Sequence, residues 1–487
     1  MKDSTVVVIL AAGLGTRFKS KLPKVLHSAG GRTLIDHVVR AVKPLASRAT
    51  FAVIGYQAAQ VEQALRSAGH GPGRGPGSGP GSGEVRLILQ KKQLGTGHAL
   101  AAGERQLRRA ASSNRGTIMV VCGDTPLLTT ATLRNLLAHH RRKRAIATVL
   151  TADMANPAAY GRILRSADGS LLAIVELKSA TAEQKKIREI NTGIYCFETR
   201  ELFPALKRVR KNPVSGEYYL TDVIELLAKA GHRLAVCRAV DPDEVAGIND
   251  RAELARVDTL LRLRKARELM IAGVTIHSPE TVRIDPDVTV GADSTIEAGV
   301  YLNGGTKIGP ECVIGAYSIV TDSQLAARVT VKTSCVITES QVDDGASVGP
   351  FAHLRPGSQI GAGARIGDFV EIKKSRIGRL SRANHLAYIG DATVGEDVNI
   401  GAGTITVNYD GVNKHQTIIE DGAFIGSGSE LIAPVRIGRG AFVAAGSTIH
   451  DHVPANALAI ARARQSVKPG WMVARVRKLK KTPKTHS

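Results

Sequence analysis

A glycine-rich loop near the start of the chain combines the residue types that bind phosphate. An apolar run over residues 6–12 opens into Gly13 and Gly15, and Arg17 and Lys24 follow shortly after. Glycine lets backbone N–H groups approach a phosphate closely, a helix that starts there adds the positive end of its dipole, and the two cations neutralise charge. The spacing matches neither the dinucleotide-binding GxGxxG nor the P-loop GxxxxGK[ST]. The loop therefore predicts a phosphate site of another kind, where a strand meets a helix.

Two further polar residues each allow two interpretations when they are taken alone. Asp124 ends an apolar run, where the carboxyl end of a buried strand would open into a ligand crevice, but an aspartate at such a place is also a common helix cap. His385 lies within the regular pattern of the second half of the chain. It is either a general base or a structural histidine that is hydrogen-bonded to backbone. Residue type and position leave both choices open.

The elements that must position these residues alternate between strand and helix up to about residue 248. Continuous aliphatic runs, typical of a sheet that helices cover on both faces, occupy residues 6–10, 51–55, 118–124 and 145–150. Helix-compatible spacing occupies residues 34–45, 57–69 and 131–144. This order predicts an open, mostly parallel sheet of the nucleotide-binding type. Residues 250–272 contain no Gly or Pro and carry Leu at helical intervals, so one long connecting helix is expected there.

A repeat of six residues replaces this alternation after about residue 280. Examples are VGADST from Val290, IGPECV from Ile308, IGAGTI from Ile400 and IGRGAF from Ile437. The period predicts one short strand and one turn per repeat, with the aliphatic side chain inside and glycine at the bend. Three such strands close a triangular coil, so residues 284–453 would form roughly nine coils of about 18 residues, stacked about 4.8 Å apart.

Composition restricts the class of protein. The chain has 487 residues, enough for several domains, and its 66 Lys and Arg against 43 Asp and Glu give a formal net charge of +23, which favours anionic partners. Five widely spaced cysteines without a CxxC motif favour neither a disulfide framework nor a zinc cluster, and they fit a reducing cytoplasm. No apolar run approaches the roughly 18 residues that span a bilayer, so no transmembrane segment is expected.

Two segments fall outside both patterns. Residues 69–84 are rich in Gly, Pro and Ser, which predicts a flexible loop without a function of its own. Residues 471–487 form a basic run, and we expect a solvated or anion-contacting tail rather than a nucleic-acid-binding arm.

Several motifs together resemble one enzyme family. LAAGLGTR from Leu10 and LPK from Leu22 are similar to the sugar-1-phosphate nucleotidyltransferases. Further motifs that carry the resemblance are QLGTGHA (from Gln93), CGDTPLL (Cys122), YGRI (Tyr160), EINTGIY (Glu189), GEYYLTD (Gly216), LRPG (Leu354), NHLAYIGD (Asn384), NIGAGTITVNYDG (Asn399) and ALAIARA (Ala457). By these motifs, over nearly its whole length, the chain is identified as a member of the bifunctional N-acetylglucosamine-1-phosphate uridyltransferase and glucosamine-1-phosphate N-acetyltransferase family.

The resemblance implies an α/β fold in three parts. A Rossmann-like nucleotidyltransferase domain would occupy residues 1–248, a linker helix residues 249–272, and a left-handed parallel β-helix with acetyltransferase activity residues 273–487, which include the basic tail. The left hand comes from the resemblance, since it runs against the usual right-handed crossover rule. The family also implies a homotrimer in which each acetyl site is shared between neighbouring chains.

For the first domain the resemblance implies uridyl transfer from UTP to N-acetylglucosamine 1-phosphate, with release of pyrophosphate. Asp124 and Asn249 would hold Mg²⁺, with Mn²⁺ as the alternative cation. The other implied substrate-binding residues are Leu10, Ala11, Ala12, Gly13, Arg17, Lys24, Gln90, Gly95, Thr96, Cys122, Gly123, Gly161, Glu176 and Asn191. Of these, the backbone around Ala12 and Gly13, with Gln90, would read the uracil. A second group, Gly161, Glu176 and Asn191, would hold the sugar.

For the β-helix the resemblance implies acetyl transfer from acetyl-CoA to glucosamine 1-phosphate. His385 would be the general base that takes a proton from the attacking amine. Arg355 and Lys373 would bind the sugar phosphate, and Tyr388 and Asn399 would orient the sugar. Acetyl-CoA contacts are implied for Ala402, Asn408, Tyr409, Ser427, Ala445 and Arg462.

The implied product is UDP-N-acetylglucosamine, made in the cytoplasm for peptidoglycan and lipopolysaccharide synthesis. One alternative is a sugar-1-phosphate nucleotidyltransferase whose β-helix is only a trimerisation scaffold. That alternative would gain if His385 or the pair Asn408 and Tyr409 were missing, and all three are present. A second alternative is a binding protein for nucleic acid or anionic lipid, but no basic platform interleaved with aromatic residues supports it.

Overall fold

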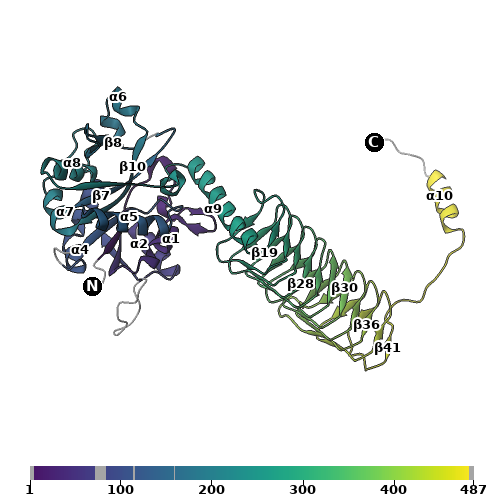
Figure 1. Ribbon diagram of the computed structural model, residues 1–487. Coiled ribbons are helices and arrows are strands. Elements are labelled where there is room, and N and C mark those ends of the chain that lie inside the picture. The colour runs from purple at the N-terminus through teal and green to yellow at the C-terminus, as the bar shows by residue number, and fades with distance from the viewer. Residues whose placement is uncertain (1–4, 72–83, 113–115, 158–159, 482–487) are drawn as a thin grey trace. The chain divides into compact units, whose positions relative to one another are not determined.

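The computed structural model describes residues 5–71, 84–112, 116–157 and 160–481, which form two compact units (Figure 1). The first unit runs through Lys265 and includes Ile284–Pro286, and the second comprises Ala266–Arg283 and the chain from Asp287 onward. The division falls within helix α9 (Arg251–Ile271), the long helix expected from the sequence. Most of the Gly/Pro/Ser-rich segment that was predicted to be a flexible loop lies outside the described residues.

The first unit contains a nine-stranded mixed sheet. Its main path has the order β11-β7-β10-β6-β1-β4-β5, and β8 and β9 extend it from β10. The strands are β1 (Val6–Ala11), β4 (Ala49–Ile54), β5 (Val85–Leu89), β6 (Thr117–Cys122), β7 (Ala147–Asp153), β8 (Arg162–Arg165), β9 (Leu171–Val175), β10 (Glu189–Glu198) and β11 (Leu234–Arg238). Along the main path only β10 pairs antiparallel with its neighbours. The predicted mostly parallel sheet is confirmed for the main path apart from β10, and β8 and β9 beside it also pair antiparallel.

Helices cover both faces of this sheet, as the continuous apolar strands require. Alternate residues of β1 enter opposite cores: Val6 and Val8 belong to one apolar cluster, Val7 and Ile9 to the other. The first cluster packs against α3 (Thr96–Ala102), α4 (Glu104–Ala110), α7 (Thr199–Leu206) and α8 (Thr221–Lys229). The second packs against α1 (Leu34–Val42), α2 (Ala58–Ser67) and α5 (Thr130–Lys143).

The carboxyl ends of β1 and β6 bring the glycine loop and Asp124 to one place. The two strands are parallel neighbours, and Leu10 pairs with Cys122 at their ends. Residues that follow each strand therefore enter the same crevice, where open α/β sheets bind ligands. Gly123 N donates a hydrogen bond to Leu10 O at 2.9 Å and ties the two loops together.

The second unit is a parallel β-helix with three sheets. The first sheet has 11 strands from β12 (Thr275–Ile276) to β41 (Leu458–Ala459), the second has 10 from β13 (Arg283–Ile284) to β40 (Thr448–Ile449), and the third has 9 from β14 (Thr289–Val290) to β38 (Val435–Ile437). We call the turn from first to second sheet the first edge, and the turn from second to third sheet the second edge. The predicted β-helix is confirmed, and it extends beyond residues 284–453 at both ends.

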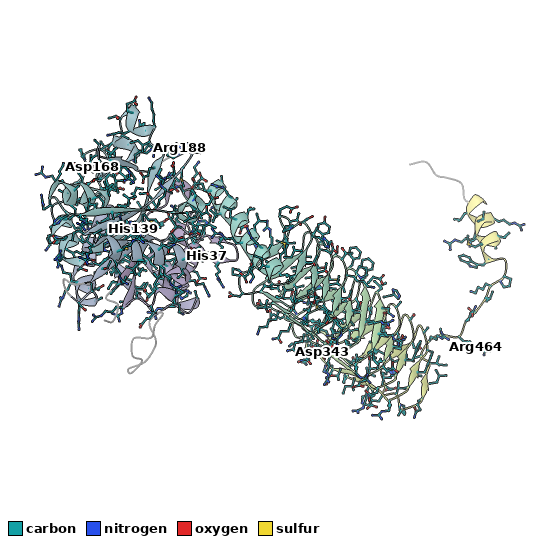
Figure 2. The ribbon with its side chains drawn as sticks, viewed as in Figure 1. His37, His139, Asp168, Arg188, Asp343 and Arg464 are labelled. Atoms are coloured by element: carbon teal, nitrogen blue, oxygen red, sulfur yellow. The ribbon has the colours of Figure 1, made fainter. Side chains whose placement is uncertain are left out.

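Each short strand places one side chain outside and the next inside. Lys307 is exposed and Ile308 is buried, and the exposed Asp343, which follows strand β23 (Gln341–Val342), also lies on the outer surface of the coil (Figure 2). Glycine is required at some bends because coils approach closely: a Cβ on Gly291 would lie 2.4 Å from Pro310 N. The six-residue period thus follows from one inward aliphatic residue per strand and a small residue per turn.

Three further expectations can be compared with the structure. All five cysteines are free. No helix in the described part of the chain is both long and apolar enough to cross a membrane. The basic tail was expected to be solvated or to contact anions, and its secondary structure was not predicted. Trp471–Lys481 forms helix α10, whose side chains are exposed from Trp471 to Leu479, and residues 482–487 lie outside the described part.

Two candidate active sites

A cavity of about 650 Å³ opens at the carboxyl ends of β1 and β6 in the first unit. Thirteen of the sixteen residues predicted for uridyl transfer line it: Leu10, Ala11, Ala12, Gly13, Arg17, Lys24, Gln90, Gly95, Thr96, Cys122, Asp124, Glu176 and Asn249. These residues come from separate loops that the parallel strands bring together.

Three predicted residues do not line this cavity. Gly123 lies behind it, bonded to Leu10. Gly161 and Asn191 lie together, since Asn191 N donates to Gly161 O at 2.9 Å. The amide of Asn191 is used inside β10, where Nδ2 donates to Tyr195 Oη at 2.8 Å and Oδ1 accepts from Gly193 N at 3.2 Å.

The cavity also contains Gly15 of the predicted phosphate loop and residues that were not assigned from the sequence: Leu14, Thr16, Val25, Gln93, Ala99, Glu217 and Tyr219. Gln93, Glu217 and Tyr219 stand in motifs that carry the family resemblance, so the motifs indicated this region without giving these residues a role.

Two cationic side chains are bonded to the side-chain oxygens of the residues predicted to bind metal. Lys24 Nζ forms an ion pair with the carboxylate of Asp124, and Arg17 Nη2 donates to Asn249 Oδ1 at 2.9 Å. Ile248 N donates to Asp124 O at 3.1 Å and holds the Asn249 segment beside Asp124. The arrangement stabilises positive charge at this point of the cavity.

Burial raises the pKa of two other ionisable groups in the cavity. Burial raises the pKa of the Cys122 thiol to about 12, with a smaller contribution from the Asp124 charge, so Cys122 stays protonated and is no nucleophile at neutral pH. Burial also raises the pKa of Glu176, against the hydrogen bond from Thr221 Oγ1 at 3.2 Å. Desolvation of this carboxyl thus favours its neutral form relative to a solvated glutamate.

In the β-helix, four predicted residues form a column along the first edge. Consecutive coils pair in register at Arg382, Asn399, Phe424 and Phe442. The column members lie three residues after these positions and are, in the same order, His385, Ala402, Ser427 and Ala445. At about 4.8 Å per coil the column is about 14 Å long. Arg462 Nη1 donates to Ala445 O at 2.7 Å, so Arg462 lies at the C-terminal end of this column. Gly403, Gly428 and Gly446 follow the last three members and keep this part of the edge free of side chains.

The imidazole at the start of this column is oriented by a carboxylate. His385 Nδ1 lies 2.7 Å from Asp368 Oδ1, and Asp368 occupies the equivalent position on the preceding coil. Hydrogen bonds from its own backbone N–H and from His385 lower the pKa of Asp368, so it is ionised at neutral pH. Nδ1 of His385 is thereby the donor to Asp368, and Nε2 is left to accept a proton from a substrate.

A group of cations lies toward the second edge. Arg355 and Lys373 occupy equivalent positions on consecutive coils, and Gly390 follows on the next coil. Lys414, not assigned from the sequence, reaches this group from the loop after β34 (Ile405–Val407). The contact with Lys373 lowers the pKa of Lys414, as expected for two ammonium groups that lie close together.

The loop that carries Lys414 is held by local polar contacts. The carboxylate of Asp410 accepts hydrogen bonds from Asn413 N at 2.6 Å and Val412 N at 2.8 Å, and Oδ2 lies 2.7 Å from His415 Nε2. These contacts, the Asn413 N–H first, lower the pKa of Asp410 to about 2. Asn408 Nδ2 donates to Asp391 Oδ2 at 2.5 Å and fixes the base of the loop.

One chain does not bring all the predicted acetyl-transfer residues together. Ala402, Ser427 and Ala445 lie on the first edge, whereas Asn408 and Tyr409 follow β34 at the second edge. Asn399 pairs with Arg382 at the start of its strand, away from the first edge. Tyr388, outward on the second sheet, pairs with Glu371 and lies between the two edges.

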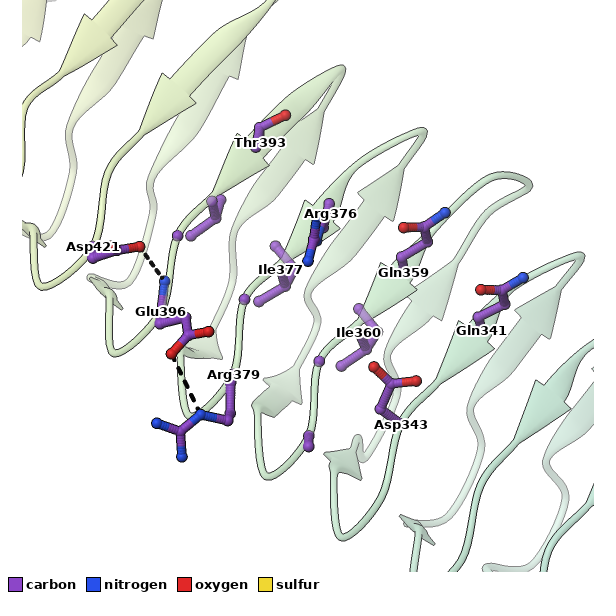
Figure 3. Close-up of a pocket in the computed structure, with 15 residues that line it drawn as sticks. Gln341, Asp343, Gln359, Ile360, Arg376, Ile377, Arg379, Thr393, Glu396 and Asp421 are labelled. Carbon is purple, nitrogen blue, oxygen red and sulfur yellow. Dashed lines mark hydrogen bonds and ion pairs between the residues drawn. The ribbon is translucent and has the colours of Figure 1, made fainter.

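A cavity of about 630 Å³ on the third sheet is separate from these groups and contains none of the predicted residues (Figure 3). Its charged side chains are partly paired: Arg379 Nε donates to Glu396 Oε2 at 3.3 Å, and Asp421 Oδ1 accepts from Glu396 N at 2.9 Å. We assign it no role in acetyl transfer.

Comparisons with known proteins cover both units. The MobA-like NTP transferase domain family matches residues 7–190, and the bacterial transferase hexapeptide family matches residues 287–322 and 416–451. "Bifunctional protein GlmU" of Geobacillus thermodenitrificans is 48% identical over 98% of this chain and 99% of its own. The proteins of the same name from Exiguobacterium sibiricum and Halalkalibacterium halodurans are each 47% identical, over 95% and 96% of this chain and 99% and 98% of their own.

Proposed function

The chain belongs to the GlmU family of bifunctional enzymes, and we propose that its two units carry the two reactions at the residues described above. The enzyme acetylates glucosamine 1-phosphate with acetyl-CoA, then transfers uridyl from UTP to the product, giving UDP-N-acetylglucosamine. The observation that carries this assignment is that similarity to bifunctional relatives extends over 95–98% of the chain, so both candidate sites lie inside the matched region.

In acetyl transfer His385 acts as the general base. Nε2 takes a proton from the glucosamine amine as the nitrogen attacks the thioester carbonyl, and coenzyme A leaves as the thiol. Asp368 acts as a positioning residue, because its bond to Nδ1 fixes the ring and stabilises the imidazolium that forms.

The sugar phosphate fits the cation group toward the second edge. Arg355, Lys373 and Lys414 would bind the phosphate, while Tyr388 and Asn399 would orient the sugar. Acetyl-CoA would lie along the column of Ala402, Ser427 and Ala445 toward Arg462, with the thioester at His385. The glycines beside the column support this placement, since they leave the edge open to a long ligand.

A homotrimer would complete the acetyl site. Asn408 and Tyr409 lie at the second edge, so a neighbouring chain could bring its second edge to this chain's first edge and supply them. On the N-terminal part of the first edge, Tyr317, Phe351, Phe369 and Leu386 are 50–69% exposed, and the rings of Phe351 and Phe369 stack at 5.4 Å. An exposed aromatic column of this kind supports burial against another chain.

In uridyl transfer the phosphate oxygen of N-acetylglucosamine 1-phosphate attacks the α-phosphorus of UTP, and pyrophosphate leaves. The nucleophile is already an anion, so no protein base is required, and the reaction depends on alignment and charge neutralisation. Arg17 and Lys24 would neutralise the phosphates, and the backbone around Ala12 and Gly13 would contact the uracil with Gln90. Glu176, with Gly161 and Asn191, would hold the sugar.

The oxygen atoms at Asp124 and Asn249 fit a magnesium ion. One carboxylate and one amide oxygen are hard donors of the kind Mg²⁺ takes, with phosphate and water filling the remaining positions. Lys24 and Arg17 now place positive charge on these same oxygens, and both cations would turn to phosphate when substrate binds. No group of three or more His, Cys, Asp or Glu side chains among the described residues could hold a metal ion, which agrees with binding through few protein ligands. Asp124 and Asn249 would hold the ion, and its charge would supply electrostatic stabilisation to the nucleotide phosphates and to the leaving pyrophosphate.

A cytoplasmic location completes the proposal, because acetyl-CoA and UTP are cytoplasmic substrates and all five thiols are free.

Two substitutions test the division of labour. Asp124→Ala should lower uridyl transfer at least about a hundredfold and spare acetyl transfer, because it removes a proposed metal ligand from the first unit. His385→Ala should lower acetyl transfer by about 10²–10⁴ and spare uridyl transfer. Glu183→Ala in the first unit and His277→Ala in the first coil, both at exposed positions, are matched controls. Loss of both activities in either site variant, with the melting temperature unchanged, would contradict the assignment.

A further inference from the structure

The side-chain amide of Gln90 faces the cavity of the first unit with both of its hydrogens already in use. Gln90 is 3% exposed, and Nε2 donates to Gly95 O at 3.1 Å and lies 3.0 Å from His98 Nδ1. Gln90 nevertheless lines the cavity. No described residue donates to Oε1 of Gln90, so this oxygen is the amide atom left for a ligand.

The orientation of this amide follows from its partners. A backbone carbonyl only accepts hydrogen bonds, so the nitrogen of the amide, and not the oxygen, must face Gly95 O. Gly95 O is itself fixed, because it also accepts from Ala99 N at 3.1 Å in the first turn of α3. His98 Nδ1 must then accept the second N–H of Gln90, which places the proton of the neutral imidazole on Nε2.

The neighbouring Gln93 provides a contrast. Gln93 Nε2 donates one hydrogen to Gln90 O at 3.0 Å, which leaves it a second hydrogen and its oxygen. Gln93 can therefore pair with a donor or with an acceptor, whereas Gln90 offers only an acceptor. Of the two amides, Gln90 is therefore the one whose bonding pattern distinguishes a donor from an acceptor on a ligand.

We propose that His98 is a specificity-determining positioning residue, which locks Gln90 so that the cavity accepts uracil and rejects cytosine. Uracil presents an N3–H donor, which Gln90 Oε1 can accept. Cytosine presents a lone pair at N3, which would face the lone pairs of Oε1 with neither group satisfied. This inference rests on the proposed uridyl transfer and on the placement of the base at Gln90.

Without His98 the orientation of the Gln90 amide would be less restricted. The Gln90 amide would then be held by Gly95 O alone, and turning to present an N–H toward N3 of cytosine would break one hydrogen bond instead of two. The ring of His98 also lies against Tyr218, at 6.5 Å between centroids, which holds the imidazole at this distance from Gln90. His98 thus acts through Gln90 and need not contact the reacting phosphates.

The test is the ratio of kcat/KM for UTP to that for CTP, measured by pyrophosphate release with N-acetylglucosamine 1-phosphate. His98→Leu should lower this ratio at least about tenfold. The Gln90 amide can then turn to pair with N3 of cytosine, so binding of CTP no longer leaves a polar group unpaired. His98→Asn should restore most of it, since its amide oxygen can stand near the position of Nδ1. The melting temperature and the turnover of UTP by the same samples report whether the first unit of each variant is folded.

A second measurement uses the unmodified enzyme. N3-methyl-UTP, which lacks the donor, should lose most of kcat/KM, whereas pseudouridine triphosphate, which keeps N3–H between two carbonyls, should retain it. An unchanged UTP/CTP ratio in His98→Leu, or equal use of UTP and N3-methyl-UTP, would overturn the role of His98 and Gln90. Absence of pyrophosphate release from UTP by the unmodified enzyme would instead overturn the proposed function itself.

Discussion

At the scale of single residues, the chemistry of both sites depends on side chains whose partners fix their orientation. Asp368 holds the ring of His385, and His98 holds the amide of Gln90. Lys24 and Arg17 occupy the oxygens of Asp124 and Asn249. In each case a polar contact within 3.0 Å selects one of the several side-chain orientations that the residue could adopt without its partner.

The contact of Asp368 with His385 predicts a loss in turnover rather than in binding. Asp368→Asn should lower kcat for acetyl transfer about ten- to a hundredfold, because the imidazolium loses its ionised partner. KM for acetyl-CoA should stay unchanged, since Asp368 contacts His385 and not the ligand column. Steady-state thiol release measures both constants. A rise in KM with an unchanged kcat would show that Asp368 has a binding role instead.

The cation group predicts a pH dependence. Lys373, by hydrogen bond and by charge, lowers the pKa of Lys414, against the opposite effects of Asp391 and Tyr388. As pH rises, Lys414 therefore loses its proton before an ordinary lysine would, and the sugar phosphate loses one positive partner. KM for glucosamine 1-phosphate should rise on the alkaline side, below the pH where an isolated lysine titrates.

Lys414→Met should raise KM at neutral pH and remove this alkaline rise, whereas Lys307→Met, an exposed position on the third sheet, should do neither. An alkaline rise in KM that persists in Lys414→Met would assign the titration to another group.

The sequence predicted more of the elements than of the side-chain orientations. Residues 6–11 and 117–122 are strands because continuous aliphatic runs suit a sheet covered on both faces, and Asp124 follows the second of them as expected. The assignment of Asn191 to the sugar stays a prediction, but the bond of its amide to Tyr195 within β10, where the register shifts between these two residues, was not predicted. Such an irregularity leaves no mark in the period of the sequence.

In the β-helix, too, the sequence predicted the strands but not every side-chain contact. The six-residue period predicted which residues point inward, because each coil repeats the same geometry. Lys414 lies in a loop outside the period, and its approach to Lys373 depends on the local bonds of Asp410. The helical form of the tail was also missed, since a basic run by itself is equally compatible with a solvated coil.

At the scale of elements, the ends of the Gly/Pro/Ser-rich segment are fixed by the first unit. Val85 N donates to His70 O at 2.9 Å, and the buried His70 places Nε2 2.5 Å from Asp36 Oδ1. Deleting residues 72–83 would make His70, Gly71, Glu84 and Val85 consecutive, so the existing hydrogen bond would close a four-residue turn. The melting temperature should change by no more than a few degrees.

His70→Ala is the matched comparison for this deletion. It should lower the melting temperature, because a buried partner of Asp36 is lost. Thermal unfolding followed by circular dichroism measures both variants. A large fall in melting temperature for the deletion would show that residues 72–83 contribute to the fold.

At the scale of the whole molecule, the acetyl-transfer residues of one chain are divided between two edges of the β-helix, so activity should depend on assembly. Phe369 is 58% exposed on the aromatic column of the first edge. Phe369→Glu costs little in an isolated chain but would place a charge in the proposed interface. We expect the unmodified protein to have the mass of three chains by light scattering and the variant to have the mass of one.

The variant should lose acetyl transfer and keep uridyl transfer, because the cavity of the first unit lies within one chain. Gln359→Glu, an exposed position on the third sheet, is the control and should remain trimeric. A single-chain mass for the unmodified protein with full acetyl transfer would refute the shared site.

The central claim is that one chain performs both reactions in a fixed order, and a single assay tests it most directly. Purified protein would receive glucosamine 1-phosphate, acetyl-CoA, UTP and Mg²⁺, with free thiol and pyrophosphate followed in the same sample. We predict release of both, and no pyrophosphate when acetyl-CoA is omitted, because the uridyl acceptor is then not formed. Pyrophosphate release without acetyl-CoA would contradict the order, and release of only one of the two products in the complete mixture would contradict the bifunctional assignment.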